Sequence, residues 1–194
     1  MARFSVKVEI SSYWHAGSGA GRGADVDALV LKGRDGIPYL PGRTLKGLLR
    51  EGMAVCEELG HISPGRTDAL FGKPAPEGRG DGSVPGALIV SGAALPEAER
   101  LWLASKEGHG AREALFDRFA STRISEDGTA EEHTLRASEL CVPLTLHAEV
   151  EGPPDAQADL EKACSFVRGL GSHRSRGLGR CRLSIEDIKE LPHA

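Results

Sequence analysis

The order of the apolar patterns along the chain limits its possible folds more than any other feature of the sequence. Segments with strand-like or helix-like spacing of apolar side chains are separated by loops rich in glycine, proline and charge. They predict a strand at 4–10, a helix at 44–59, strands at 87–90 and 140–150, a helix at 155–168 and a strand from 181 to about 188. This order predicts an α+β protein with a ferredoxin-like, or modified RRM-like, βαββαβ fold, in which helices cover one face of an antiparallel sheet.

The length and the composition fit one folded domain. The chain has 194 residues, of which 40% are hydrophobic and 27% charged, so it can bury a full core. No stretch between the patterns has the composition of a linker. We therefore expect residues 1–194 to form a single domain, with insertions around 11–36, 72–86 and 121–139.

The sequence favours a cytoplasmic protein without a membrane partner. No apolar stretch reaches the roughly 18 residues of a membrane span, and no secretion signal opens the chain. The four cysteines show no CxxC spacing, which favours reduced, mostly buried thiols over disulfides or metal ligation. They are Cys56, Cys141, Cys164 and Cys181.

Positive charge is concentrated in two short segments, although the net charge of the chain is −4. Residues 168–182 contain five arginines, residues 43–50 contain three cations, and neither segment contains an acid. This concentration indicates a local groove for a polyanion, although charge alone would also fit a solvated basic face. Aromatic residues make up only 5% of the chain. We therefore expect contact with a sugar-phosphate backbone rather than stacking on bases.

The segment 169–180 combines glycines and arginines in a way that suits phosphate binding. Glycine lets a polyanion approach the backbone N–H groups closely, and the arginine fork matches the geometry of phosphate. The alternative is a glycine-rich turn that carries surface arginines. The candidate RNA-binding residues here are Gly171, Ser172, His173, Arg174, Ser175, Arg176 and Gly177.

Residues 41–50 place the predicted start of the first helix beside several cations. Thr44 is expected to cap this helix and Gly60 to end it. A helix N-terminus has free N–H groups that favour an anion, although the glycine spacing before Lys46 differs from that of a nucleotide P-loop. The alternative is an ordinary capped helix with a solvated lysine. The candidate RNA contacts are Arg43, Thr44, Lys46 and Arg50.

Two carboxylates and two histidines are candidates for chemistry. Asp25 and Asp27 share one face if their segment is extended. There they could hold a divalent cation or accept a proton from a ribose 2′-hydroxyl, although most such pairs are only loop residues. His15 and His173 lie in glycine-rich segments and could serve as a general acid or base or donate to phosphate, but each also fits an ordinary surface histidine.

Several motifs together are similar to those of one protein family. Asp27 precedes IPYLPGRTLKGLLR (37–50), LFG follows at 70–72, and LGSHRSRGLG (170–179) is similar to a glycine-rich signature loop. On these motifs the chain resembles the RAMP superfamily of CRISPR-Cas proteins, and more narrowly the backbone subunit of type III interference complexes.

The resemblance implies guide-RNA binding along the sugar-phosphate backbone and stacking of several copies into a filament, beside other effector subunits. Residues 121–139 would form a protruding hairpin that displaces a base at intervals, and His15 would face the RNA. Asp27, with Asp25 as its rival, would cleave complementary target RNA with a divalent cation, expected to be Mg²⁺, held by Asp27. The alternatives are a non-catalytic guide-binding or capping subunit of the same complex, and a stand-alone RNA-processing endoribonuclease that uses His15 or His173.

Overall fold

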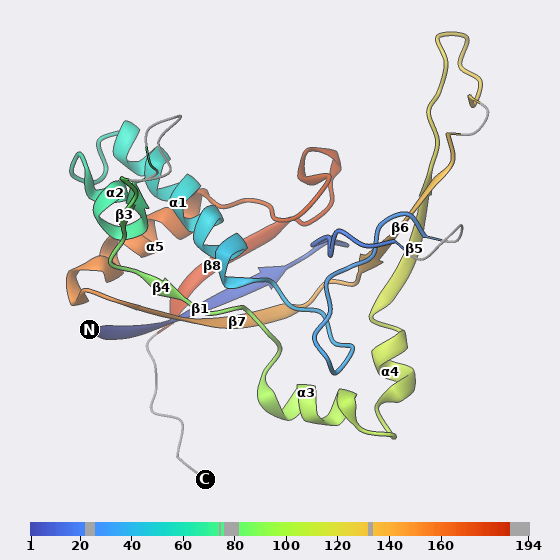
Figure 1. Cartoon of the computed structure of the whole chain (residues 1–194), viewed down its shortest axis with the longest axis horizontal. Helices are drawn as coiled ribbons and strands as arrows, with labels where there is room; N and C mark the ends of the chain where they lie inside the picture. Colours follow the sequence, from blue (N-terminus) through green and yellow to red (C-terminus); the bar gives the residue numbers. More distant parts are fainter. Residues whose placement is uncertain (22–25, 74, 76–81, 132–133, 187–194) are drawn as a thin grey trace.

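A four-stranded antiparallel sheet forms the centre of the molecule (Figure 1). The computed structural model describes residues 1–21, 26–73, 75, 82–131 and 134–186. The strands of the sheet are, in spatial order, β4 (Ile89–Val90), β7 (Thr145–Gly152), β1 (Ala2–Ile10) and β8 (Cys181–Glu186). The first strand of the chain thus lies between the last two, as in a ferredoxin-like fold.

The other elements are helices and short strands around this sheet (Figure 1). The helices are α1 (Gly42–Glu58), α2 (Arg66–Phe71), α3 (Glu97–Ala104), α4 (His109–Glu113) and α5 (Gln157–Phe166), with 3₁₀ turns η1 (Pro154–Ala156) and η2 (Arg174–Arg176). The remaining strands form the pairs β2 (Gly72–Lys73) with β3 (Val84–Pro85) and β5 (Phe116–Ser121) with β6 (Arg136–Cys141). The β5–β6 hairpin extends away from the rest of the molecule.

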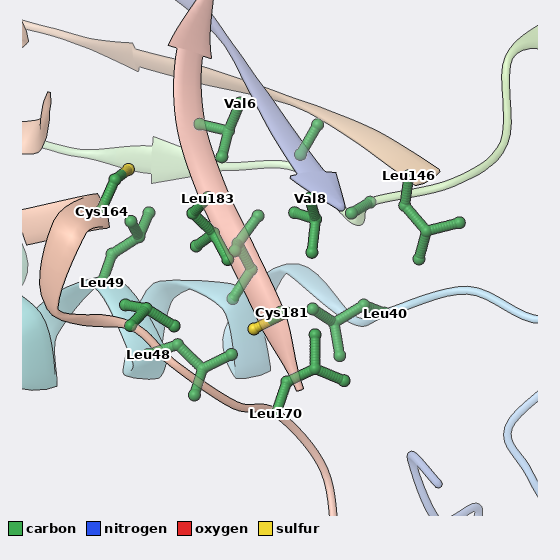
Figure 2. Close-up of a cluster of buried hydrophobic side chains, with 14 of the residues drawn as sticks. Val6, Val8, Leu40, Leu48, Leu49, Leu146, Cys164, Leu170, Cys181 and Leu183 are labelled. Atoms are coloured by element: carbon green, nitrogen blue, oxygen red, sulfur yellow. The ribbon is translucent and has the colours of Figure 1, made fainter. Parts of the chain in front are cut away.

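The core lies between the sheet and the helices α1 and α5. Val6 and Val8 of β1 are fully buried, because alternate side chains of a strand point to the same face. Figure 2 shows these side chains pointing toward Leu48 and Leu49 of α1, with Cys164 of α5 beside them. The alternating pattern at 4–10 and the helical leucine spacing therefore meet in one apolar layer, which provides most of the hydrophobic burial.

The structure confirms the α+β fold and the predicted element order, and it corrects several boundaries. Helix α1 begins at Gly42 after Pro41, and it has no side-chain cap bond, so Thr44 lies inside the first turn instead of capping it. The helix does end before Gly60, whose φ of 73° is one that favours glycine. The strand predicted at 87–90 is shortened to β4.

The strand predicted at 140–150 is in fact the end of one strand and the start of another. β6 ends at Cys141 and β7 begins at Thr145, with Pro143 between them. Proline has no N–H for a sheet ladder, so the chain leaves the hairpin there and enters the central sheet. Because the apolar pattern continues over 140–150, it did not indicate that the chain passes from one sheet to another there.

All four cysteines are buried and form no disulfide, in agreement with the prediction of reduced, buried thiols. Burial raises the pKa of Cys141 and of Cys164 to about 12. Within the part of the chain that the structure describes, no helix has the length and apolarity needed to span a bilayer.

Candidate nucleic-acid interface

A second layer of backbone pairing lies beside the central sheet and joins most of the predicted site residues. It consists of residues 14–20, residues 26–32, β6 and the glycine-rich loop at 169–180, and we call it the loop layer. Trp14 and Cys141 exchange backbone hydrogen bonds of 3.0 and 2.8 Å, and Gly17 pairs with Val30. The segments that hold His15, Asp27 and the glycine-rich loop are therefore neighbours in space, although they are far apart along the chain.

The glycine-rich loop has a backbone that only glycine tolerates at several points. Gly171, Gly177 and Gly179 have φ values of 75°, 89° and 65°, in the region that favours glycine. A Cβ at Gly179 would collide with the carbonyl oxygen of Leu170, and one at Gly171 would collide with that of His15. The glycines thus let the loop fold back on its own base and pack against residues 15 and 16.

The tip of this loop offers exposed donors. Ser172, His173, Ser175 and Arg176 are all exposed, and Arg176 forms no ion pair with the described residues. His173 has a φ of 58°, which is unusual for a residue with a side chain. Hydroxyl groups and the Arg176 side chain therefore lie at the surface of this loop.

Arg174 differs from its neighbours because its guanidinium already has a partner. Its Nη1 lies 3.0 Å from Oε2 of Glu51 in α1, and both side chains are more than half exposed. This ion pair connects the loop to the middle of α1. A phosphate would have to compete with Glu51 for the arginine.

The cations at the start of α1 are also mostly engaged. Lys46 donates from Nζ to the carbonyl oxygen of Leu88 at 2.8 Å, and Arg50 pairs with Asp68 of α2 at 3.2 Å. Arg43 is exposed. Of the predicted RNA contacts in this segment, Arg43 is thus the cation without a described partner, whereas Lys46 and Arg50 contact groups of the protein.

Asp27 lies at the base of the hairpin and is exposed. Its N–H donates to the carbonyl oxygen of Ala137 at 2.8 Å, and its Oδ2 accepts the N–H of the same residue at 2.8 Å. One carboxylate oxygen, Oδ2, therefore has a fixed backbone partner, in a residue that is exposed as a whole. Asp25, the predicted rival, lies outside the described residues.

Asp27 is the predicted protein ligand of a divalent cation, so the other ligands near it matter. Among the described residues, no group of three or more His, Cys, Asp or Glu side chains is arranged to hold a metal ion. Mg²⁺ is often bound through one or two carboxylates, with waters and substrate phosphates as its other ligands. Asp27 fits that pattern as a single protein ligand, with RNA phosphate and water completing the shell.

His15 is buried, in contrast to the expectation that its ring would face RNA. Only 5% of the residue is exposed, and Nδ1 lies 2.7 Å from the carbonyl oxygen of Glu139. Because a carbonyl can only accept, this nitrogen carries the proton. The backbone oxygen of His15 accepts the N–H of Ser172 at 2.9 Å. His15 therefore connects the glycine-rich loop to β6, and its ring offers little surface to a ligand.

The hairpin carries exposed apolar side chains in addition to its acidic tip. Phe119, Ile124 and Leu135 are 45%, 57% and 70% exposed. The distal part is ordered by a hydrogen bond of 2.8 Å between the hydroxyls of Thr122 and Thr134.

Two residues near the site, Glu139 and Lys32, were not predicted from the sequence to be functional. Glu139 and Lys32 form an ion pair of 2.8 Å, with the glutamate side chain only 12% exposed. The sequence signal was slight, since Glu139 is a single acid between Ser138 and Leu140 in a strand. The side chain of Glu139 contacts residues more than 100 positions away, so its role is visible only in the folded structure.

Comparison with known proteins agrees with this geometry. The family model of the RAMP superfamily matches residues 7–182, so the chain belongs to the RAMP superfamily, as its motifs predicted. A search of curated proteins gave no match.

Two solved structures have the same fold at low sequence identity. One is a chain of a type III-B Cmr-beta complex bound to cognate target RNA, with a TM-score of 0.71 and 12% identity over 95% of this chain and 97% of that one. The other is a chain of type III-B Cmr-beta in the apo state, with a TM-score of 0.66 and 13% identity over 97% and 98% of the two chains. At this level of sequence identity, the structural likeness shows that the chains share a fold.

Proposed function

We propose that this chain is a guide-RNA-binding backbone subunit of a type III CRISPR ribonucleoprotein. The observation that carries the proposal is the glycine-rich loop of a RAMP protein, with accessible Arg176, Ser172 and Ser175 at its tip. The likeness in fold to a chain of a type III-B complex bound to target RNA supports the same reading. Other subunits of that assembly, and further copies of this chain, would be its protein partners.

The loop would hold RNA through its backbone phosphates. Arg176 is free to form a forked contact with a phosphate, and Arg174 would exchange Glu51 for a second one. Arg43 at the start of α1 would add a further charge. Contacts of this kind carry no base information, as suits a subunit that accepts guides of any sequence.

The hairpin would act on the bases. Phe119, Ile124 and Leu135 present apolar surface on which a displaced or unstacked base could pack. The acids near the tip, Glu126 and Asp127, disfavour phosphate contact there. The hairpin would therefore enter the stack from the side, with its charged end beyond the RNA.

Asp27 would cleave target RNA beside each displaced base. Its carboxylate would accept the proton of the ribose 2′-hydroxyl. The 2′-oxygen would then bond to the adjacent phosphorus as the bond to the 5′-oxygen breaks and that oxygen gains a proton. The products would be a 2′,3′-cyclic phosphate and a 5′-hydroxyl. Alternatively, Asp27 would hold a divalent cation, which would neutralise charge that develops on the phosphate.

The first experiment tests RNA binding. The full chain is purified at low salt and the copurifying RNA is sequenced; we expect repeat-derived guide RNA. Arg176→Ala should weaken RNA binding and lower the salt dependence of log K by about 0.7 for single-stranded RNA. Arg3→Ala is the matched control, because Arg3 is an exposed arginine at the other end of β1. Protein free of RNA would contradict the proposal.

The second experiment tests cleavage in the assembled ribonucleoprotein. Asp27→Ala should reduce target cleavage about 100-fold or more, since general-base catalysis contributes at least that factor, and guide binding should persist. Asp127→Ala changes an exposed aspartate near the hairpin tip and should cleave normally. Cleavage that survives Asp27→Ala would mean that Asp27 is not catalytic here, and a non-catalytic guide-binding or capping subunit is the alternative function. The burial of His15 disfavours a histidine-based endoribonuclease built on that residue.

A further inference from the structure

Glu139 connects several parts of the loop layer, and it has no part in the proposed function. Its N–H donates to the carbonyl oxygen of Ala28 at 2.9 Å, and its own carbonyl oxygen accepts from His15 at 2.7 Å. Its side chain adds two more contacts. Oε2 accepts the N–H of Val30 at 3.0 Å, and Oε1 lies 2.8 Å from Nζ of Lys32. One residue thus touches both segments that lie beside β6.

The bond to Val30 extends the pairing between β6 and residues 26–32. Ala28 and Ser138 form a parallel bridge there, and Asp27 exchanges hydrogen bonds with Ala137. At Val30 the partner is the Glu139 carboxylate instead of a backbone carbonyl. The side chain therefore supplies the next hydrogen bond of the series and keeps the segment in register.

Lys32 and Phe116 hold the carboxylate of Glu139 in this position. Glu139 is 12% exposed and Lys32 is 30% exposed at their side chains, and charge-assisted hydrogen bonds are stronger when partly shielded from water. Nζ of Lys32 also lies 3.6 Å from the centre of the Phe116 ring, within the range of a cation–π contact. The carboxylate thus has two partners on the 26–32 segment, and Phe116 of β5 contacts one of them, Lys32.

We propose that Glu139 is a positioning residue for Asp27. By accepting the N–H of Val30 and pairing with Lys32, it fixes residues 26–32 against β6, and with them the carboxylate of Asp27. This inference rests on the proposed cleavage at Asp27. Small displacements of a catalytic group reduce rates strongly, because the reacting atoms must be aligned.

The test uses the assembled ribonucleoprotein with Glu139→Ala and Glu139→Gln. We expect Glu139→Ala to lower the cleavage rate constant at saturating target about tenfold or more, with KM and guide affinity unchanged within about twofold. Glu139→Gln should lose much less, about two- to threefold, because its amide oxygen can still accept from Val30. Hydrogen exchange at the Val30 amide should be faster in Glu139→Ala and close to normal in Glu139→Gln.

Glu151→Ala and Glu151→Gln are the matched controls. Glu151 is a strand glutamate that pairs with Arg3 at 3.0 Å in the central sheet, and its variants should cleave normally. Normal cleavage by Glu139→Ala, or a parallel loss of rate and guide affinity, would overturn the proposal. If Glu139→Ala does not fold, Glu139→Met decides the matter: it keeps most of the stem but removes both acceptor oxygens, and unchanged cleavage and Val30 exchange would overturn the proposal.

The outcomes separate this inference from the proposed function. Cleavage that continues in Asp27→Ala would refute catalysis by Asp27 itself. Cleavage lost in Asp27→Ala but normal in Glu139→Ala would refute only the positioning role of Glu139.

Discussion

The central sheet and the loop layer are stabilised by different interactions. Between the sheet and its helices, side chains such as Val8, Leu49 and Leu160 are fully buried, and stability comes from apolar packing. The loop layer has some buried anchors, Trp14 and Leu170 among them, but its segments are joined mainly by backbone hydrogen bonds. A packed core tolerates little change, whereas a hydrogen-bonded layer leaves its outward side chains free for a ligand.

The largest expected effect distinguishes the core from the hairpin. Leu49→Ala should lower the free energy of unfolding by about 2–5 kcal/mol, since it opens a cavity at a fully buried site. Leu135→Ala, which truncates a leucine that is 70% exposed, should change it by less than about 0.5 kcal/mol. Urea unfolding measures both. Equal losses would mean that the hairpin is packed in solution and that the comparison is wrong.

Two glycines of the loop layer give the next largest effect. Gly179→Ala should destabilise the fold by about 1–3 kcal/mol from backbone strain alone, and its Cβ would also collide with Leu170. Gly177 has a similar positive φ but no atom near its absent side chain, so Gly177→Ala should cost about 1–2 kcal/mol. Thermal unfolding and RNA affinity should both rank the variants in this order. A Gly177 variant as damaged as the Gly179 variant would show that close approach is not the cause.

The thiols test whether the loop layer opens separately from the core. Burial raises the pKa of Cys164 to about 12 and that of Cys181 to about 11, from an ordinary value of 9.0. An unfolded chain then loses thiol protons at a lower pH than the folded one. The stability that these thiols contribute is therefore fully present below pH 9.0. Above pH 9.0, the free energy of unfolding falls by at most about 1.4 kcal/mol per pH unit for each thiol.

Urea unfolding across this pH range measures the loss, and thiol labelling of the native protein locates local opening. Cys141 belongs to the loop layer, so it should react before the core thiols Cys56 and Cys164 if that layer opens on its own. Simultaneous reaction of all three would indicate one cooperative unit.

The smallest effect concerns the ion pair between Arg174 and Glu51. Both side chains are more than half exposed, so Glu51→Gln should change stability by less than about 1 kcal/mol. It should raise RNA affinity by up to about fivefold, since Arg174 no longer has to leave a carboxylate. Filter binding at low salt measures this. Unchanged affinity would mean that Arg174 does not contact phosphate.

The sequence predicted the core well because its signals are local. The alternation at 4–10 and the leucine spacing of α1 each determine which face is buried, without reference to distant residues. The boundaries were less accurate where one residue decided them. Pro143 divides an apolar run into two strands, and Pro41 precedes a helix that was expected to begin at Thr44.

The candidate site was only partly predictable, because its decisive contacts are long-range. Glycine and arginine content located the loop at 169–180, but not the engagement of Arg174 by Glu51, which lies 123 positions away. Lys46 looked free because Leu88, its acceptor, is 42 positions away. His15 looked exposed among glycines, and its burial depends on Glu139, 124 positions away. No local pattern contains such information.

The position of β1 has a consequence for how the chain reaches its native state. β1 is synthesised before both of the strands that pair with its edges, which begin at Thr145 and Cys181. During synthesis, β1 therefore lacks both strand partners until more than 130 further residues have been added. Such non-local pairing slows folding and exposes an apolar strand to wrong associations. A nascent chain of this design would benefit from a chaperone that covers β1.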